Sequence, residues 1–296
     1  MTRHLLVAVN GGERSAAALD WSIHWAVTHS MSIELCTVVD DGWAAEDYPA
    51  IEKAHQRVLD AARERVEIEA PHLVASSVLH RGSLVEALVH LAAHSDVLVV
   101  GSRKSAMLEG AIHGTLALKV AERITRPLVA VPEGWTSGDG RIVVGVDDET
   151  DADAVEFAAR AAESTSSALT LVRAVAEPVY YSPYDFGGRW ELLQELRQYS
   201  ERMLADRSAS LRKAHPGILV DELVDVGRAS QLMVRASGGA SLAVVGTHAR
   251  GVVLGMLLGS VGRDLLMNMP CPVTVVPLAA PNRPDDDVAL MTSLAQ

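Results

Sequence analysis

Short apolar runs alternate along the chain with longer stretches in which apolar and polar residues recur at helical spacing. The runs LLVAV (5–9), VLVVG (97–101) and LVAV (128–131) are rich in β-branched residues and predict buried parallel strands. Between such runs, Ser15–Thr28 and Ala50–Val66 repeat apolar residues every three or four positions, which predicts amphipathic helices. This alternation predicts an α/β fold with a mostly parallel sheet and helices on both faces.

The pattern occurs twice. DVLVVGSRKSAMLEGAIHGT (96–115) aligns with SLAVVGTHARGVVLGMLLGS (241–260), and three pairs of glycines coincide. From Gly82 and Gly227 to the prolines at 132 and 277, matching residues stay 145 positions apart without a gap. A constant offset over so long a stretch indicates a tandem duplication, with the order β-α-β-α-β-α-β-α-β in each half.

The first strands of the two halves also align. HLLVAVN (4–10) matches RIVVGVD (141–147), and IELCTVV (33–39) matches LTLVRAV (169–175). The glycine-rich, polar stretch EGWTSGDG (133–140) is typical of a linker. We therefore predict domains at 1–136 and 137–280, followed by a flexible tail at 281–296 that begins with prolines and an acidic triplet.

Composition and charge narrow the class of protein. Hydrophobic residues make up 49% and charged residues 22% of 296 residues, which is a globular balance. No apolar run reaches the roughly eighteen residues of a membrane span, and the start MTRHLLVAVN lacks a signal-peptidase site, so we expect a cytoplasmic protein. Its two cysteines, Cys36 and Cys271, fit buried thiols. A net charge of −12 argues against nucleic acid and anionic membrane as partners, although backbone amides can still bind a nucleotide.

The stretch GTHARGVVLGMLLGS (246–260) carries the main candidate chemistry. It follows the apolar run Leu242–Val245 and precedes a predicted helix, Val261–Asn268, so it lies where ligands bind in parallel sheets. Glycine lets backbone amides approach an anion, and a helix beginning at Gly259–Ser260 offers further N–H groups. The stretch is neither a Walker loop nor a GxGxxG fingerprint. From the residues alone, a phosphate loop and a ligand-free connection both remain open.

Spacing and context supply a resemblance. Gly246, Gly259 and Ser260 resemble the G-x2-G-x9-G-[S/T] nucleotide motif of the universal stress protein family, and GVD (145–147) and PCPVTVVP (270–277) resemble its first and closing strands. The chain is thus similar to a tandem universal stress protein over nearly its whole length. The resemblance implies two Rossmann-like domains of the adenine nucleotide alpha hydrolase type, each with a five-stranded sheet. It also implies ATP binding, which many but not all members show, and dimers formed through the last strand.

The resemblance also implies roles for particular residues. Asp147 would lie near the ribose and adenine, and the adenine pocket would be lined by Gly145, Val146 and Ala174. The phosphate positions of the second half are Gly246, Thr247, His248, Ala249, Gly259, Ser260 and Val261. The matching positions of the first half are Ala8, Val9, Asn10, Val38, Gly101, Ser102, Arg103, Lys104, Gly114, Thr115 and Leu116.

Three positions depart from the family pattern. Ala249 and Lys104 stand where the motif has its second glycine, and Asn10 replaces the acidic residue. Alanine costs about 1 kcal/mol or more only if a positive φ is needed, whereas the side chain of Lys104 either fills the phosphate site or adds a charge to it. Asn10 loses a charged acceptor. We therefore expect the better ATP site in the second half and a degenerate one in the first.

Other motifs give little evidence of catalysis. NGGERS (10–15) resembles the SGGxDS loop of ATP pyrophosphatases only superficially, because Arg14 replaces its aspartate, and we expect a turn and helix start there. His90 and His94 have the spacing of two metal ligands, but no third ligand is evident, and we expect exposed or helix-end histidines. No GxSxG elbow or general base can be identified.

The aromatic segment EPVYYSPYDFGGRWELLQEL (177–196) lies between the second strand and second helix of the second half. We expect a loop that packs its own aromatic residues, with a flap over the ligand or a docking site as the alternative.

Two functions follow as hypotheses. In the first, the protein is a stress-response regulator that acts through occupancy by ATP, with magnesium, without being an enzyme. In the second, it is a ligand-free scaffold whose glycines only pack helix against strand, and weak ATP hydrolysis is a minor third. The two domains are expected to pair through strands 128–132 and 273–277, and the pair to form a homodimer.

Overall fold

The computed structural model describes residues 3–42, 46–103, 116–136, 140–147, 152–177, 186–247 and 258–278. In the first half the elements are β1 (His4–Ala8), α1 (Glu13–His29), β2 (Ser32–Val39), α2 (Tyr48–Glu69), β3 (Ala75–Arg81), α3 (Leu84–Ala92), β4 (Val97–Ser102), α4 (Leu116–Ala121) and β5 (Leu128–Pro132). In the second half they are β6 (Ile142–Gly145), α5 (Ala152–Thr165), β7 (Leu169–Val175), α6 (Phe186–Ala214), β8 (Val220–Val226), α7 (Ala229–Ala236), β9 (Leu242–Gly246), α8 (Ser260–Asn268) and β10 (Val273–Val276). The predicted alternation is confirmed in both halves.

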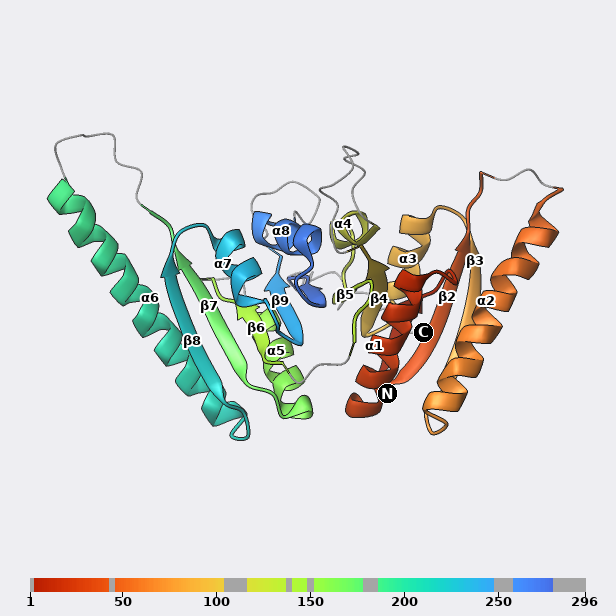
Figure 1. The fold of residues 1–296 in the computed structure, drawn as a ribbon, viewed down its shortest axis with the longest axis horizontal. Coiled ribbons are helices and arrows are strands. Elements are labelled where there is room, and N and C mark those ends of the chain that lie inside the picture. Colours follow the sequence, from red (N-terminus) through yellow and green to blue (C-terminus); the bar gives the residue numbers. More distant parts are fainter. Residues whose placement is uncertain are drawn as a thin grey trace, which may run out of the picture.

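All the strands join in one ten-stranded sheet, in the order β3-β2-β1-β4-β5-β10-β9-β6-β7-β8 (Figure 1). Neighbouring strands are parallel within each half, and β5 and β10 meet antiparallel at the centre, with Thr274 opposite Val129. The predicted pairing through the last strands is confirmed. It merges the two expected five-stranded sheets into one.

Helices cover both faces of this sheet, and each face has its own apolar core. Val97 and Val99 of β4 point into the core under α1, α2, α5 and α6. Leu98 and Val100 point into the other core, under α3, α4, α7 and α8. Because successive strand residues face opposite sides and both sides are covered, the central strands β4, β5, β9 and β10 are almost entirely apolar, whereas the edge strands β3 and β8 carry polar and charged residues. Each core continues across both halves.

A second contact between the halves joins α1 to α5. The rings of Trp25 and Phe157 stack with their centroids 6.1 Å apart, and His29 stacks on Trp25 at 3.9 Å. The Nε2 atom of His29 lies 2.5 Å from the hydroxyl oxygen of Ser164. The two halves are therefore held together by side-chain contacts between α1 and α5 as well as by the pairing of β5 with β10.

The duplication extends to unusual backbone conformations. Gly82 and Gly227 precede α3 and α7, with φ values of 133° and 138°. Residues with a side chain rarely adopt φ values in this range, so glycine is needed at both turns. The two halves therefore have the same turn, with glycine at the matching position.

The aromatic segment of the second half differs from the prediction. α6 begins at Phe186, so residues 186–196 are helical and not a loop. This stretch is rich in Glu, Leu, Gln and Arg, which favour helices. The side chain of Trp190 is 63% exposed, so the expectation that the segment packs its own aromatics is wrong for this residue. Residues 178–185 lie outside the described part of the chain.

The predicted domain boundary and tail stay predictions, because residues 137–139 and 279–296 also lie outside the described residues. Within the described ranges, every helix is too short or too polar to cross a membrane.

Candidate functional site

The order of the strands reverses at β6 and β9, which lie side by side in the second half. Residues Ile142 and Val144 pair with Leu242 and Val244, so the chain leaves both strands at the same edge of the sheet. After β6 comes Asp147, and after β9 comes Thr247. In open parallel sheets, a reversal of this kind opens a crevice in which ligands bind.

The carboxylate of Asp147 is 41% exposed and lies near a largely buried cation. The Nη1 atom of Arg173, on β7, is 3.9 Å from this carboxylate, and the arginine side chain is 13% exposed. The same Nη1 donates to the carbonyl of Val146 at 3.5 Å, and Nε donates to the hydroxyl of Ser200 at 3.4 Å. Sequence reasoning missed Arg173. The available signal was an arginine within the otherwise apolar strand LTLVRAV, next to Ala174.

The residues assigned to the adenine pocket belong to the packed end of the sheet. Val146 is buried and its N–H donates to the carbonyl of Val172 at 2.9 Å. Ala174 is partly buried against the core under α7 and α8. A Cβ at Gly145 would lie 3.4 Å from the sulfur of Met233, an ordinary contact, so a methyl group fits there. The structure brings these three positions together beside Asp147.

Thr247 has a structural role of its own. Its side chain is 1% exposed, and its hydroxyl accepts a hydrogen bond of 3.0 Å from the N–H of Leu278. Its own N–H donates to the carbonyl of Val276 at 3.0 Å. These bonds hold the chain that follows β10 against the end of β9.

The N-terminus of α8 has the features of an anion site. Gly259 is the N-cap residue, and no described side chain accepts a capping hydrogen bond there. The first helical bond joins the N–H of Arg263 to the carbonyl of Gly259, so the N–H groups of Ser260 and Val261 have no partner within the helix. These groups carry the positive end of the helix dipole. Gly246 is partly buried at the end of β9. His248 and Ala249 lie outside the described residues.

In the first half, the residue that matches Asp147 is tied into its own turn. The side-chain oxygen of Asn10 accepts a hydrogen bond from the N–H of Gly12 at 3.0 Å. The hydroxyl of Ser15 accepts from the N–H of Asn10 at 3.2 Å and donates to the carbonyl of Gly12 at 2.9 Å. The predicted turn and helix start are confirmed, and they engage the oxygen that a ligand would need.

Packing requires a glycine at position 101. A Cβ there would lie 2.1 Å from the carbonyl oxygen of Arg14, because the first turn of α1 rests directly on β4. The next residue, Ser102, is 4% exposed, and among the described residues its hydroxyl has no hydrogen-bond partner. This half therefore supports the view that a glycine can be kept without a ligand.

The other predicted positions of the first half range from buried to exposed. Val9 is buried, Ala8, Val38 and Leu116 are partly buried, and Arg103 is exposed. Lys104, Gly114 and Thr115 lie outside the described residues.

The predicted exposure of two histidines is confirmed: His90 and His94 are exposed at the end of α3. In the ranges that the structure describes, no group of side chains forms a set of metal ligands. Cys36 and Cys271 are buried, and burial raises the pKa of each thiol to about 12.

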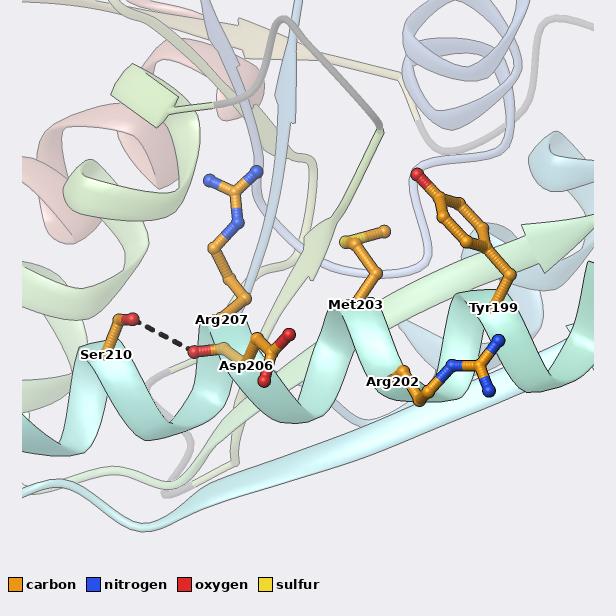
Figure 2. A pocket seen from close by; sticks show the side chains of 6 residues that line it. All are labelled: Tyr199, Arg202, Met203, Asp206, Arg207 and Ser210. Atoms are coloured by element: carbon orange, nitrogen blue, oxygen red, sulfur yellow. Dashed lines mark hydrogen bonds between the residues drawn. The ribbon is translucent and has the colours of Figure 1, made fainter.

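A cavity of about 540 Å³ lies along α6. Figure 2 shows Ser210 bonded to the backbone of Asp206, with the 2.9 Å bond running within the helix. The described lining contains none of the predicted site residues: it consists of Tyr199, Arg202, Met203, Asp206, Arg207 and Ser210.

Comparisons with known proteins agree with this architecture. The model of the universal stress protein family matches residues 1–132 and again residues 140–277. A universal stress protein of Mycobacterium tuberculosis is 26% identical over 302 residues, covering 92% of this chain and 94% of the relative. One of Mycolicibacterium smegmatis is 26% identical over 294 residues, covering 92% and 96%.

Solved structures with the same fold span both halves. The crystal structure of a universal stress protein from Archaeoglobus fulgidus DSM 4304 has a TM-score of 0.69 at 18% identity, covering 93% of this chain and 98% of the other. That of a putative universal stress protein from Pseudomonas aeruginosa UCBPP-PA14 has a TM-score of 0.62 at 17% identity, covering 99% and 98%.

Proposed function

The chain belongs to the universal stress protein family, with two family domains in tandem, and from this premise we propose that it is a regulatory protein whose second half binds ATP. The observation that carries the proposal is the pairing of two features at the reversal of strand order. The N-terminus of α8, which no side chain of the described residues caps, suits phosphate, and the half-exposed carboxylate of Asp147 suits ribose hydroxyls.

The residues present fit a magnesium–nucleotide complex. The N–H groups of Ser260 and Val261 would donate to phosphate oxygens, and Asp147 would accept hydrogen bonds from the ribose. Bound magnesium would offset part of the phosphate charge. Local donors matter because the chain carries a net charge of −12, which opposes an anion at long range.

We propose that only one half binds ATP tightly. The oxygen of Asn10 is engaged by Gly12, and Gly101 is explained by its contact with Arg14. These observations favour a scaffold role for the first half, as in the second hypothesis. The expected stoichiometry is therefore one nucleotide per chain.

Regulation would follow from occupancy and not from turnover. A nucleotide shifts a conformational or assembly equilibrium only if it binds one state more tightly than the other. The protein would act in the cytoplasm, and a second copy of the chain would be its assembly partner.

Titration calorimetry with Mg-ATP tests the proposal. Asp147→Ala removes a charged acceptor worth about 1.5–3 kcal/mol, so the Kd is expected to rise roughly 10- to 150-fold. Asn10→Ala, at the matching position of the first half, is the control and is expected to leave the Kd unchanged. Equal effects of the two variants would contradict the assignment.

Gly259→Glu is a sharper probe of the phosphate position. A carboxylate at the N-terminus of α8 interacts favourably with the helix dipole, so the helix is expected to stay folded. The same charge repels phosphate, so ATP binding is expected to be lost. Retained binding with full affinity would rule out this helix as the phosphate site.

A further inference from the structure

Arg173 contacts residues from two separate parts of the second half, the end of β6 and helix α6. Its guanidinium lies 3.9 Å from the carboxylate of Asp147 and 3.5 Å from the carbonyl of Val146, both at the end of β6. Its Nε lies 3.4 Å from the hydroxyl of Ser200 on α6, a residue that is 3% exposed. One side chain of β7 thus links the candidate ribose contact to the helix that packs on β7 and β8.

Stability alone is a weak explanation for this arginine. A guanidinium is always charged in proteins, and only 13% of this side chain is exposed to water. The partner carboxylate of Asp147 is 41% exposed at 3.9 Å, and solvent-exposed ion pairs contribute only about 0–1 kcal/mol to stability. A charged group in the strand LTLVRAV therefore calls for a role in the site.

The duplicated first half provides an internal comparison. Gly145 pairs with Val172 in the register between β6 and β7, as Ala8 pairs with Cys36 between β1 and β2. One residue further along β7 and β2 stand Arg173 and Thr37, and two residues after Gly145 and Ala8 stand Asp147 and Asn10. Both members of the pair are charged in the second half, and both are neutral in the first.

The position faces the second helix in both halves. In the first half, the hydroxyl of Thr37 forms a hydrogen bond of 2.8 Å with Nδ1 of His55 on α2. In the second half, the corresponding contact joins Arg173 to Ser200. The position thus contacts the second helix in both halves, and the charge pair occurs in the half with the better candidate site.

We propose that Arg173 is a positioning residue of the ATP site: it orients the carboxylate of Asp147 toward the ribose and offsets its negative charge. This inference rests on the proposed function. Without the arginine, the carboxylate would lose an anchor and would repel the polyanionic nucleotide. Arg173 is less exposed than Asp147 and acts through its carboxylate.

A double-mutant cycle in ATP affinity tests this role. Arg173→Thr introduces the residue of the first half and is expected to raise the Kd for Mg-ATP about tenfold. In an Asp147→Asn background, the same change is expected to alter the Kd less than about twofold, because the carboxylate to be positioned is gone. Thr37→Val is the matched control in the first half and should leave the Kd unchanged.

Arg173→Lys separates charge from packing. Lysine keeps the charge without the planar fork, so it is expected to recover part of the affinity, with a Kd between those of Arg173→Thr and the unaltered protein. Thermal unfolding of each variant reports folding independently. If Arg173→Thr does not fold, Arg173→Lys alone carries the test. Its effect on the Kd for Mg-ATP is then measured once with Asp147 present and once in the Asp147→Asn background.

Failure of this inference differs from failure of the proposed function. If the unaltered protein binds ATP and Arg173→Thr binds it equally well, the positioning role is refuted and the site stands. Equal losses in the two backgrounds also refute it, since packing would then explain the effect. If the unaltered protein binds no ATP, the proposed function fails and the inference fails with it.

Discussion

Replacing Gly101 by alanine tests whether this glycine is kept for packing. The added Cβ would lie 2.1 Å from the carbonyl oxygen and 2.4 Å from the carbonyl carbon of Arg14. Real Cβ atoms essentially never approach closer than 3.0 Å, so α1 and β4 must separate by about 0.9 Å. Both contacts are to backbone atoms, which cannot rotate away as a side chain would.

The expected cost follows from this overlap. Overpacking a close-packed interior typically costs about 1–3 kcal/mol. At roughly 2.1 cal/mol/K of unfolding entropy per residue, each kcal/mol lowers the Tm of a 296-residue chain by about 1.6 °C. We therefore expect Gly101→Ala to lower the Tm measured by calorimetry by at least about 1.5 °C. Gly145→Ala is the matched control, since its Cβ would meet Met233 at 3.4 Å without overlap. Equal Tm values for Gly101→Ala and the unaltered protein would refute the reasoning.

Three further predictions concern titratable groups. Burial lowers the pKa of His29 below 6.5, so its contribution to stability is complete above pH 6.5 and is lost as the pH falls toward the folded-state pKa. His29→Gln should reduce the loss of unfolding free energy below pH 6.5, as measured by urea unfolding at a series of pH values. An unchanged pH dependence of the unfolding free energy would contradict this. The hydrogen bond with Glu163 raises the pKa of His215, so its contribution is complete below pH 6.5 and is lost as the pH rises through the folded-state pKa. His215→Gln should therefore reduce the loss of unfolding free energy as the pH rises above 6.5. A pH dependence of the unfolding free energy equal to that of the unaltered protein would contradict this. Because Cys36 and Cys271 are buried with a pKa of about 12, both should react with a thiol reagent only after denaturation. Labelling of either cysteine in the folded protein would show that this burial is wrong.

The elements and their order could be predicted because their signals are local. Apolar runs and helical spacing are read within a few residues, and α1 and α2 begin and end within three residues of their predicted bounds. Pairing of β5 with β10 followed from the family resemblance. In the aromatic segment, by contrast, the signals of loop and helix compete, and the start of α6 at Phe186 was missed.

The candidate site could be predicted less fully because its details are tertiary. The need for glycine at 101 arises from Arg14, which is distant in sequence but rests on β4. The engagement of Asn10 by Gly12 and the position of Arg173 beside Asp147 depend on how turns and strands meet. A spacing motif identifies where a ligand loop lies, whereas these contacts decide which half suits a ligand.

The nucleotide content of the protein purified without added nucleotide tests the central claim most directly. The protein is denatured, and the released compounds are identified and counted by chromatography and mass spectrometry. The account predicts close to one ATP per chain, retained in Asn10→Ala and lost in Asp147→Ala. A protein that releases no nucleotide, and that takes up no Mg-ATP at millimolar concentration, would contradict it and favour the ligand-free scaffold.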